Sequence, residues 1–496
     1  MTLTGETVVS LRHPDRFFIG GEWVAPSSDA TIRVVDSTSE EVFLIVAEAI
    51  GTDIARAVTA ARQAFDEGPW PRLSHAERAG YLRAIAAGLR ERGADVAQMW
   101  PRETGMLYSV AAQAGAVAAA YFDEHADMAD SYPFEERATP TMGGQFGLLV
   151  REPVGVVGAI PAFNGTLTNI SHKVPPALLA GCTVVLKMPP SSPGQGYVLA
   201  EVAESVGLPP GVLNVLTADR EASELMVRAP GVDKIAFTGS SATGRRIAAI
   251  CGERMARFNL ELGGKSAAVI LDDMDIPTAA ATLAAYECVN TGQTCNSLTR
   301  IIVSRGRHDE MVDALASVFS GVRVGDPFDS NSQMGPLVSE QQRARVEAYI
   351  AKGQAEGATL AAGGGRPQHL ERGFYVEPTV FGNVDNSSTI AQEEIFGPVL
   401  SVIPADDEEQ AVAIANDSIY GLSSAVFTND VDRARDVAGR LRAGTVGHNA
   451  ARGDFGIAFG GFKQSGVGRE GGIEGLLPYL ETKTVILEGR PAGYEQ

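Results

Sequence analysis

Residues 154–160 read VGVVGAI, a short run of apolar and β-branched residues that is typical of a strand buried on both faces. Similar runs follow at 182–188 (CTVVLKM), 212–218 (VLNVLTA) and 233–239 (DKIAFTG), with helical stretches between them. Strands that alternate with helices predict βαβ units, a parallel sheet and right-handed crossovers. Ligands bind such sheets at the carboxyl ends of the strands, so this region has the architecture of a dinucleotide-binding fold.

The regions on either side of this block are also α/β in character. Apolar residues at helical spacing predict helices over 52–66 and 75–92, so the first 130 residues are expected to be largely helical after a strand-rich opening. A second alternating block begins with SAAVILDD, continues through a helix at 276–290 and the strand TRIIVS, and predicts a separate α/β domain starting near Gly263.

The tail of the chain, YLETKTVILEG at 479–489, alternates polar and apolar residues like a strand with one solvated face. No hairpin partner is near it in the sequence. An exposed strand edge is a template for pairing with another chain, so the tail is predicted to pair with a second subunit.

Composition excludes several classes of function. The chain has 496 residues, enough for two or three domains. Its 41 Lys and Arg against 61 Asp and Glu give a net charge of -20, which repels nucleic acids and anionic membranes. The N-terminus lacks the pattern of a secretion signal, and no apolar run has the length of a membrane span, so a cytoplasmic protein is expected. The four cysteines form no CxxC pair and no zinc site, so no metal is expected.

Several polar residues stand where predicted strands end. Lys187 is suited to a ribose or phosphate, Asn164 offers amide donors for an oxyanion, and Glu261 precedes two glycines as a candidate general base. Gly239 opens the turn FTGSSATG before a helix, whose backbone N–H groups are suited to a pyrophosphate, although GxGxxG is absent. Each position also has an ordinary structural interpretation, as a solvated strand end or a turn.

One cysteine lies in an unusual setting. Cys295 is surrounded by polar residues in NTGQTCNS at 290–297, between a predicted helix and the strand TRIIVS. Either it fills a turn, or it is a nucleophile whose pKa is lowered in a cleft between domains. No histidine is near it in the sequence to act as its base, and Glu261 is the strongest candidate across the predicted cleft.

Together these stretches resemble the NAD(P)-dependent aldehyde dehydrogenase superfamily over nearly the whole chain. The motifs occur in the family's order and approximate spacing: AIPAFNGTL, TVVLKMPPSSPGQ, FTGSSATGRRI, LELGGKS, NTGQTCNSLTR, QEEIFGPVL and FGGFKQSGVGREGG. The resemblance implies an α/β fold with a Rossmann-like cofactor domain (1–130 and 151–262), an α/β catalytic domain (263–462) and a small β oligomerisation extension (131–150 and 463–496).

The resemblance also implies a role for each site residue. Cys295 would be the nucleophile, Glu261 the general base and Asn164 an oxyanion donor. The implied cofactor-binding residues are Lys187, Gly239, Ser240, Glu394 and Phe396. The implied partner is a small-molecule aldehyde, and the implied assembly is a homodimer or homotetramer.

The chemistry accounts for these residue types. An aldehyde has no leaving group, so a thiolate adds to give a thiohemiacetal, and hydride then passes to the nicotinamide. Water activated by a carboxylate hydrolyses the remaining thioester.

The chain departs from the family pattern in two regions. Pro190 stands where many members carry an acidic residue that binds the adenosine ribose, so NAD is the first expectation and NADP is also permitted. The implied substrate tunnel residues are His172, Thr294, Asn296 and Phe459, with 448–450 along the other wall. The first three predict a tunnel more polar or roomier than a simple aliphatic aldehyde requires.

Two alternatives to a hydrolytic aldehyde dehydrogenase follow. An enzyme that passes the thioester to coenzyme A is disfavoured by Glu261, because a base that activates water is wasted there. A dinucleotide-binding structural protein without catalysis is disfavoured by the intact Cys295, Glu261 and Asn164.

Overall fold

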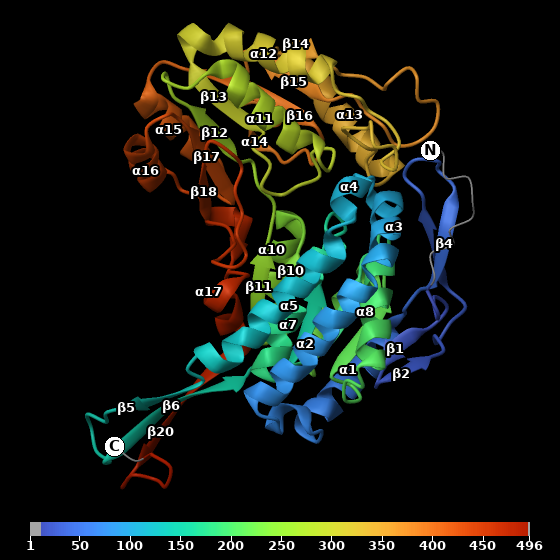
Figure 1. The fold of residues 1–496 in the computed structure, drawn as a ribbon, viewed down its shortest axis with the longest axis vertical. Coiled ribbons are helices and arrows are strands. Elements are labelled where there is room, and N and C mark those ends of the chain that lie inside the picture. Colours follow the sequence, from blue (N-terminus) through green and yellow to red (C-terminus); the bar gives the residue numbers. More distant parts are fainter. Residues whose placement is uncertain (1–10, 495–496) are drawn as a thin grey trace.

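The computed structural model describes residues 11–494 and contains two large sheets, a small projecting sheet and a two-stranded hairpin. Figure 1 shows the two large sheets as separate lobes, one above the other, with the small sheet extending from the lower lobe. Residues 1–10, which the expectation about a secretion signal includes, lie outside the described residues.

The lower sheet has eight strands in the order β19-β11-β10-β7-β8-β9-β1-β2. Its strands are β1 (Phe17–Ile19), β2 (Glu22–Val24), β7 (Val156–Ile160), β8 (Thr183–Met188), β9 (Leu213–Thr217), β10 (Lys234–Thr238), β11 (Arg257–Glu261) and β19 (Gly466–Val467). The five strands from β7 to β11 are parallel, and β1, β2 and β19 are antiparallel to their neighbours. The predicted βαβ block is therefore confirmed.

Helices cover both faces of this sheet (Figure 1). They are α1 (Gly51–Asp66), α2 (His75–Glu91), α3 (Gly93–Thr104), α4 (Tyr108–Ala111), α5 (Ala114–Ser131), α6 (Thr166–Ser171), α7 (Val174–Ala180), α8 (Gly194–Ser205), α9 (Arg220–Arg228) and α10 (Ser241–Glu253), with the 3-10 turn η1 (Trp70–Arg72). Successive strand side chains point to opposite faces, so Val184 packs with Leu82 of α2, while Val185 packs with Ile54 of α1 and Ile250 of α10. Burial on both faces explains the continuous apolar strand sequences.

The upper sheet has seven strands in the order β14-β15-β16-β13-β12-β17-β18, all parallel except for the β14–β15 pair. The strands are β12 (Ala267–Ile270), β13 (Arg300–Ser304), β14 (Thr359–Ala362), β15 (Thr379–Gly382), β16 (Val399–Ala405), β17 (Ser423–Phe427) and β18 (Thr445–His448). The helices are α11 (Ile276–Cys288), α12 (His308–Ser320), α13 (Glu340–Ala355), α14 (Thr389–Gln392), α15 (Glu408–Asn416) and α16 (Val431–Arg440), with the 3-10 turn η2 (Arg305–Arg307). The predicted second α/β unit is thus present.

The helix before Cys295 has clear sequence signals at both ends. Asp275 precedes α11, and its carboxylate accepts a hydrogen bond from the backbone N–H of Thr278 at 3.0 Å, with Pro277 in the first turn. The chain leaves the helix after Cys288 and turns through Thr291 and Gly292, which both have positive φ. This turn sends the following segment, with Cys295, away from the helix axis.

The C-terminal tail pairs within its own chain. Strand β20 (Leu480–Leu487) runs antiparallel to β6 (Phe146–Pro153), which also pairs with β5 (Glu135–Ala138). The prediction that the tail pairs with another subunit is therefore wrong for one edge of β20, which β6 of the same chain occupies. Its partner was missed because it lies far away in the sequence.

The remaining short elements connect these units. The hairpin is made of β3 (Thr31–Val35) and β4 (Val42–Ala47). The last segment contains η3 (Lys463–Ser465), α17 (Gly472–Leu476) and η4 (Leu477–Tyr479). Part of this segment, β19, pairs with β11 of the lower sheet, although 463–496 was assigned to the oligomerisation extension.

Candidate active site

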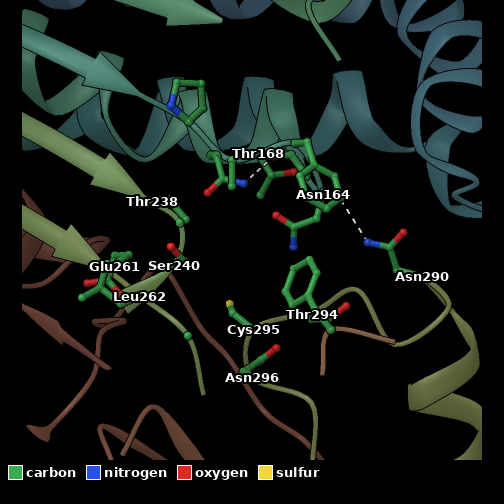
Figure 2. Close-up of a pocket in the computed structure, with 18 of the residues that line it drawn as sticks. Asn164, Thr168, Thr238, Ser240, Glu261, Leu262, Asn290, Thr294, Cys295 and Asn296 are labelled. Atoms are coloured by element: carbon green, nitrogen blue, oxygen red, sulfur yellow. Dashed lines mark hydrogen bonds between the residues drawn. The ribbon is translucent and has the colours of Figure 1, made fainter. Parts of the chain in front are cut away.

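A cavity of about 810 Å³ lies between the two large sheets and is lined from both. The predicted site residues that line it are Asn164, His172, Lys187, Gly239, Ser240, Glu261, Thr294, Cys295, Asn296, Glu394, Phe396 and Phe459. Figure 2 shows Glu261 at a strand end, Cys295 on a loop and Asn164 across the space from that loop. The fold therefore brings these twelve predicted residues together around one cavity.

Cys295 lies on the loop between α11 and β13, half-buried at the cavity. Burial raises the pKa of its thiol to about 12, with further contributions from the carboxyl groups of Glu394 and Glu261. The prediction of a lowered thiol pKa is therefore wrong for the protein alone, because no cation among the described residues outweighs burial and the acidic neighbours. The neighbouring backbone N–H groups of Cys295 and Asn296 act in the opposite direction.

Asn164 is attached to the same loop. Its amide Nδ2 donates to the carbonyl of Gln293 at 2.9 Å, and the Asn290 amide donates to the Asn164 carbonyl at 3.0 Å. An amide nitrogen carries two N–H donors, so this bond leaves one for the cavity. Asn164 is thus fixed relative to Cys295 through the backbone that precedes the thiol.

Glu261 ends β11 and is buried, with a side-chain carboxyl group that has no hydrogen-bond partner among the described residues. Burial and the nearby Glu470 raise its pKa well above the usual value, while Lys173 and Arg469 oppose the shift. Gly460 has a φ of +153°, and a Cβ at that position would stand 2.7 Å from Glu261 Oε1. The glycine gives the carboxyl group the space it occupies.

Two charged residues beside Glu261 had no assigned role. Lys173 is buried, donates from Nζ to Thr238 Oγ1 at 2.5 Å, and forms a buried ion pair with Glu470. Glu470 lies in the motif FGGFKQSGVGREGG, which marked its importance without revealing its contact. Lys173 directly follows His172, but nothing in its local sequence distinguishes it from a solvated lysine.

The residues expected to hold a dinucleotide fit that group. Lys187 ends β8 and lines the cavity, and burial lowers its pKa to about 8. Ser240 caps α10 by accepting a hydrogen bond from the Thr243 N–H at 3.3 Å, so the positive end of this helix faces the cavity beside Gly239. A cation at the end of a strand and a helix N-terminus together suit a ribose and a pyrophosphate.

The opposite end of the cofactor region contains Glu394 and Phe396. Burial raises the pKa of Glu394 to about 7, and its Oε1 accepts a hydrogen bond from the Gly264 N–H at 3.1 Å. Phe396 has a positive φ of 62° and packs edge-on against Phe163, with ring centroids 5.7 Å apart. This arrangement offers a carboxyl group for hydroxyl recognition and an aromatic wall for a flat ring.

The substrate side of the cavity is more aromatic than the sequence predicted. The His172 ring stacks on Phe455 at 3.5 Å between centroids, and Phe455 stacks on Phe459 at 4.4 Å. Burial lowers the pKa of His172 well below its usual value, which favours a neutral ring. The Asn296 oxygen accepts a hydrogen bond from the Tyr286 hydroxyl at 2.8 Å, so its acceptor is already engaged.

The predicted wall at 448–450 is displaced by a few residues. The cavity is lined by Ala451, Arg452 and Gly453 instead. His448 Nε2 lies 3.0 Å from the carbonyl of Thr428, and Asn449 donates to the same carbonyl at 2.8 Å. These two residues therefore hold the segment that forms the wall.

No helix within residues 11–494 is long and apolar enough to cross a membrane. The same range contains no group of three or more His, Cys, Asp or Glu side chains placed to hold a metal ion.

The aldehyde dehydrogenase family model matches residues 23–485, and the chain belongs to this family. The expected fold and the expected class of enzyme, an aldehyde-oxidising dehydrogenase, are confirmed.

Individual relatives are similar over their full length. Geranial dehydrogenase of Castellaniella defragrans is 43% identical over 473 residues, which cover 95% of this chain and 98% of the relative. A solved Mycobacterium tuberculosis aldehyde dehydrogenase complexed with NAD+ has a TM-score of 0.93 at 44% identity, covering 97% of this chain and 99% of the other. A mutant aldehyde dehydrogenase C of Pseudomonas syringae with NAD+ and octanal has a TM-score of 0.92 at 39% identity, covering 97% and 98%.

Proposed function

We propose that this protein oxidises an aldehyde to the carboxylic acid with NAD, using Cys295 as the nucleophile and Glu261 as the general base. The observation that carries the proposal is the meeting of Cys295, from the loop before the upper sheet, and Glu261, from the lower sheet, in one cavity with Asn164. NAD is the proposed cofactor because the similar solved structures from M. tuberculosis and P. syringae hold NAD+.

The residues divide the work as follows. The Cys295 thiol releases its proton to water, and the resulting thiolate adds to the carbonyl carbon while the Asn164 amide donates to the oxygen that gains the negative charge. NAD, when bound, accepts the hydride that leaves this carbon. Glu261 then takes a proton from water, whose oxygen attacks the thioester while the Cys295 sulfur leaves. Burial and the nearby Glu470 raise the pKa of the Glu261 carboxyl group, which makes its carboxylate a stronger proton acceptor.

The cofactor is proposed to contact two groups of residues that line the cavity. Lys187 would contact the adenosine ribose, Gly239 and Ser240 the pyrophosphate, and Glu394 the nicotinamide ribose, with Phe396 beside the nicotinamide. Pro190 supplies no carboxylate that would repel a 2′-phosphate, so the choice between NAD and NADP is decided by measuring both.

The proposed substrates are aldehydes with an extended, largely apolar body. The stacked rings of His172, Phe455 and Phe459 support this class, since aromatic faces bind apolar surface. The names of two similar proteins, a geranial dehydrogenase and an octanal complex, point the same way. The panel should cover aliphatic, aromatic, terpenoid and semialdehyde compounds, and a clear preference for short charged semialdehydes would contradict this class.

The domain division, assembly and location are proposed with the function. The lower sheet would form the cofactor domain, the upper sheet the catalytic domain, and the projecting strands β5, β6 and β20 the surface that builds a homodimer or homotetramer in the cytoplasm. The free outer edge of β20 supports this use of the arm. Light scattering of the purified protein measures the assembly, and a monomer would contradict it.

The decisive experiment compares the protein with Cys295→Ala. Aldehyde and NAD or NADP should raise the absorbance of reduced nicotinamide with the unsubstituted protein and give no signal with the variant, because alanine has no sulfur to add to the carbonyl carbon. Activity that survives the substitution would remove Cys295 as the nucleophile. Turnover that requires added coenzyme A would replace hydrolysis by acyl transfer.

A further inference from the structure

A second buried group of polar side chains lies behind the loop that carries Cys295. It consists of Lys265 at the end of the LELGGKS motif, Glu287 on α11 and Ser297 on the loop itself, which are 2%, 1% and 5% exposed. None of the three lines the large cavity. The mechanism proposed above therefore leaves them without a role.

Burying charge in this way is costly unless the charges are compensated. Lys265 Nζ and Glu287 Oε1 have no hydrogen-bond partner among the described residues. The two groups are of opposite charge type, and each opposes part of the pKa shift of the other. Burial lowers the pKa of Lys265 to about 7, and Arg300 adds to that shift, while Glu287, Glu394 and Glu393 oppose it. Burial likewise raises the pKa of Glu287 to about 8.

Ser297 joins this pair to the loop. Its hydroxyl has no hydrogen-bond partner among the described residues, and it lowers the pKa of the Glu287 carboxyl group against the larger effect of burial. The Ser297 N–H donates to the carbonyl of Thr294 at 3.1 Å, which closes a tight turn around Cys295. A shift of Ser297 therefore moves the segment that holds the thiol.

Lys265 contacts the same loop from the other side. A small cavity of about 10 Å³ is lined by Lys265, Thr294 and Ser297, close to the space that one water molecule needs. The preceding residue, Gly264, packs so closely on the loop that a Cβ there would stand 2.4 Å from the Cys295 carbonyl oxygen. Gly264 and Lys265 thus lie against the Cys295 turn.

We propose that Lys265 and Glu287 form a buried positioning pair that acts through Ser297 to hold the Cys295 thiol and backbone N–H in their reactive placement. This inference rests on the proposed function of Cys295. The pair does not touch the substrate or the cofactor; it keeps the turn from 294 to 297 in one conformation. Positioning of this kind affects the rate of the chemical step. Moving a reacting group by about 1 Å slows the reaction without weakening ligand binding.

The first test is Ser297→Ala, which removes the hydroxyl and no other atom. Its kcat should fall about tenfold, with the KM values for aldehyde and NAD within about twofold of the original, since one contact to a charged group is lost from the rear of the turn. The rate at which iodoacetamide alkylates Cys295 should fall in parallel. Ser423→Ala is the matched control, because Ser423 is also a buried serine whose hydroxyl has no partner, and it lines neither cavity.

The second test is Glu287→Gln, which keeps the volume and replaces the carboxyl group with an amide that does not titrate. Its kcat should also fall about tenfold, and the double variant with Ser297→Ala should be no slower than Glu287→Gln alone, because both changes break one connected contact. If Glu287→Gln does not fold, Ser297→Ala decides by itself. Unchanged kcat and unchanged alkylation in Ser297→Ala overturn the inference, whatever happens to the melting temperature. An active Cys295→Ala variant would instead overturn the proposed function.

Discussion

The two sides of the active site each contain a buried lysine and glutamate, but the two pairs are built differently. Lys173 and Glu470, beside the base Glu261, form a direct ion pair that also engages Thr238. Lys265 and Glu287, behind Cys295, attract each other without a direct ion pair. Buried charges need both proximity and hydrogen bonds to be compensated. The first pair has both, whereas Lys265 Nζ and Glu287 Oε1 have no hydrogen-bond partner among the described residues.

Removing the direct pair should have the largest effect. Lys173→Met leaves the carboxyl groups of Glu470 and Glu261 buried together without their nearest cation, and should lower the free energy of unfolding by about 3–5 kcal/mol. Denaturant titration measures the change. The control is Lys483→Met, which breaks the exposed ion pair with Glu152 and should change stability by less than about 1 kcal/mol. Equal losses in the two variants would contradict the difference between buried and exposed pairs.

The second prediction concerns Glu261, the proposed base beside the ion pair of Lys173 and Glu470. Glu261→Gln keeps the shape of the side chain but accepts no proton, so one burst of reduced cofactor per site should remain while steady turnover falls about a hundredfold or more. Stopped-flow absorbance separates the two phases. If burst and steady rate fell equally, Glu261 would be needed before the thioester forms.

The Lys265–Glu287 pair should make the free energy of unfolding depend on pH, although the change is smaller than that expected for Lys173→Met. Because the folded-state pKa of Glu287 is raised to about 8, the folded protein holds a proton there that the unfolded chain releases near its ordinary carboxyl pKa. The stability that this group contributes is therefore complete at acid pH and is lost as the pH rises toward 8, by at most about 1.4 kcal/mol per pH unit. Unfolding of the protein and of Glu287→Gln should be compared from pH 5 to 8. A stability difference independent of pH would contradict the raised pKa.

The sequence predicted the parallel strands and the residues at their carboxyl ends well, because both depend on local patterns. Runs such as VGVVGAI are buried on both faces, and strand ends of one sheet meet at one edge, so Glu261 and Lys187 had to face a common crevice. Cys295 was distinguished by its polar neighbours and by the family resemblance.

The contacts that surround these residues could not be predicted, because they join distant segments. The partner of β20 lies in β6, and Glu470 meets Lys173 from 297 positions away. The thiol pKa was predicted in the wrong direction, since the sequence does not show how deeply the thiol is buried or that Glu394 and Glu261 lie near it. Likewise, the stacking of His172 on Phe455 depends on packing between two segments that no periodicity connects.

The late position of Glu470 and β20 in the chain has a consequence for biosynthesis. During translation, Lys173 and Glu261 are made long before Glu470. Strand β6 is likewise made long before β20, whose Lys483 pairs with Glu152, 331 positions earlier. Contacts between such distant residues form slowly and leave strand edges exposed in the meantime. The nascent chain therefore keeps Lys173 without Glu470 and β6 without β20 until those later residues have been made, and a chaperone that shields this edge should raise the yield of active enzyme.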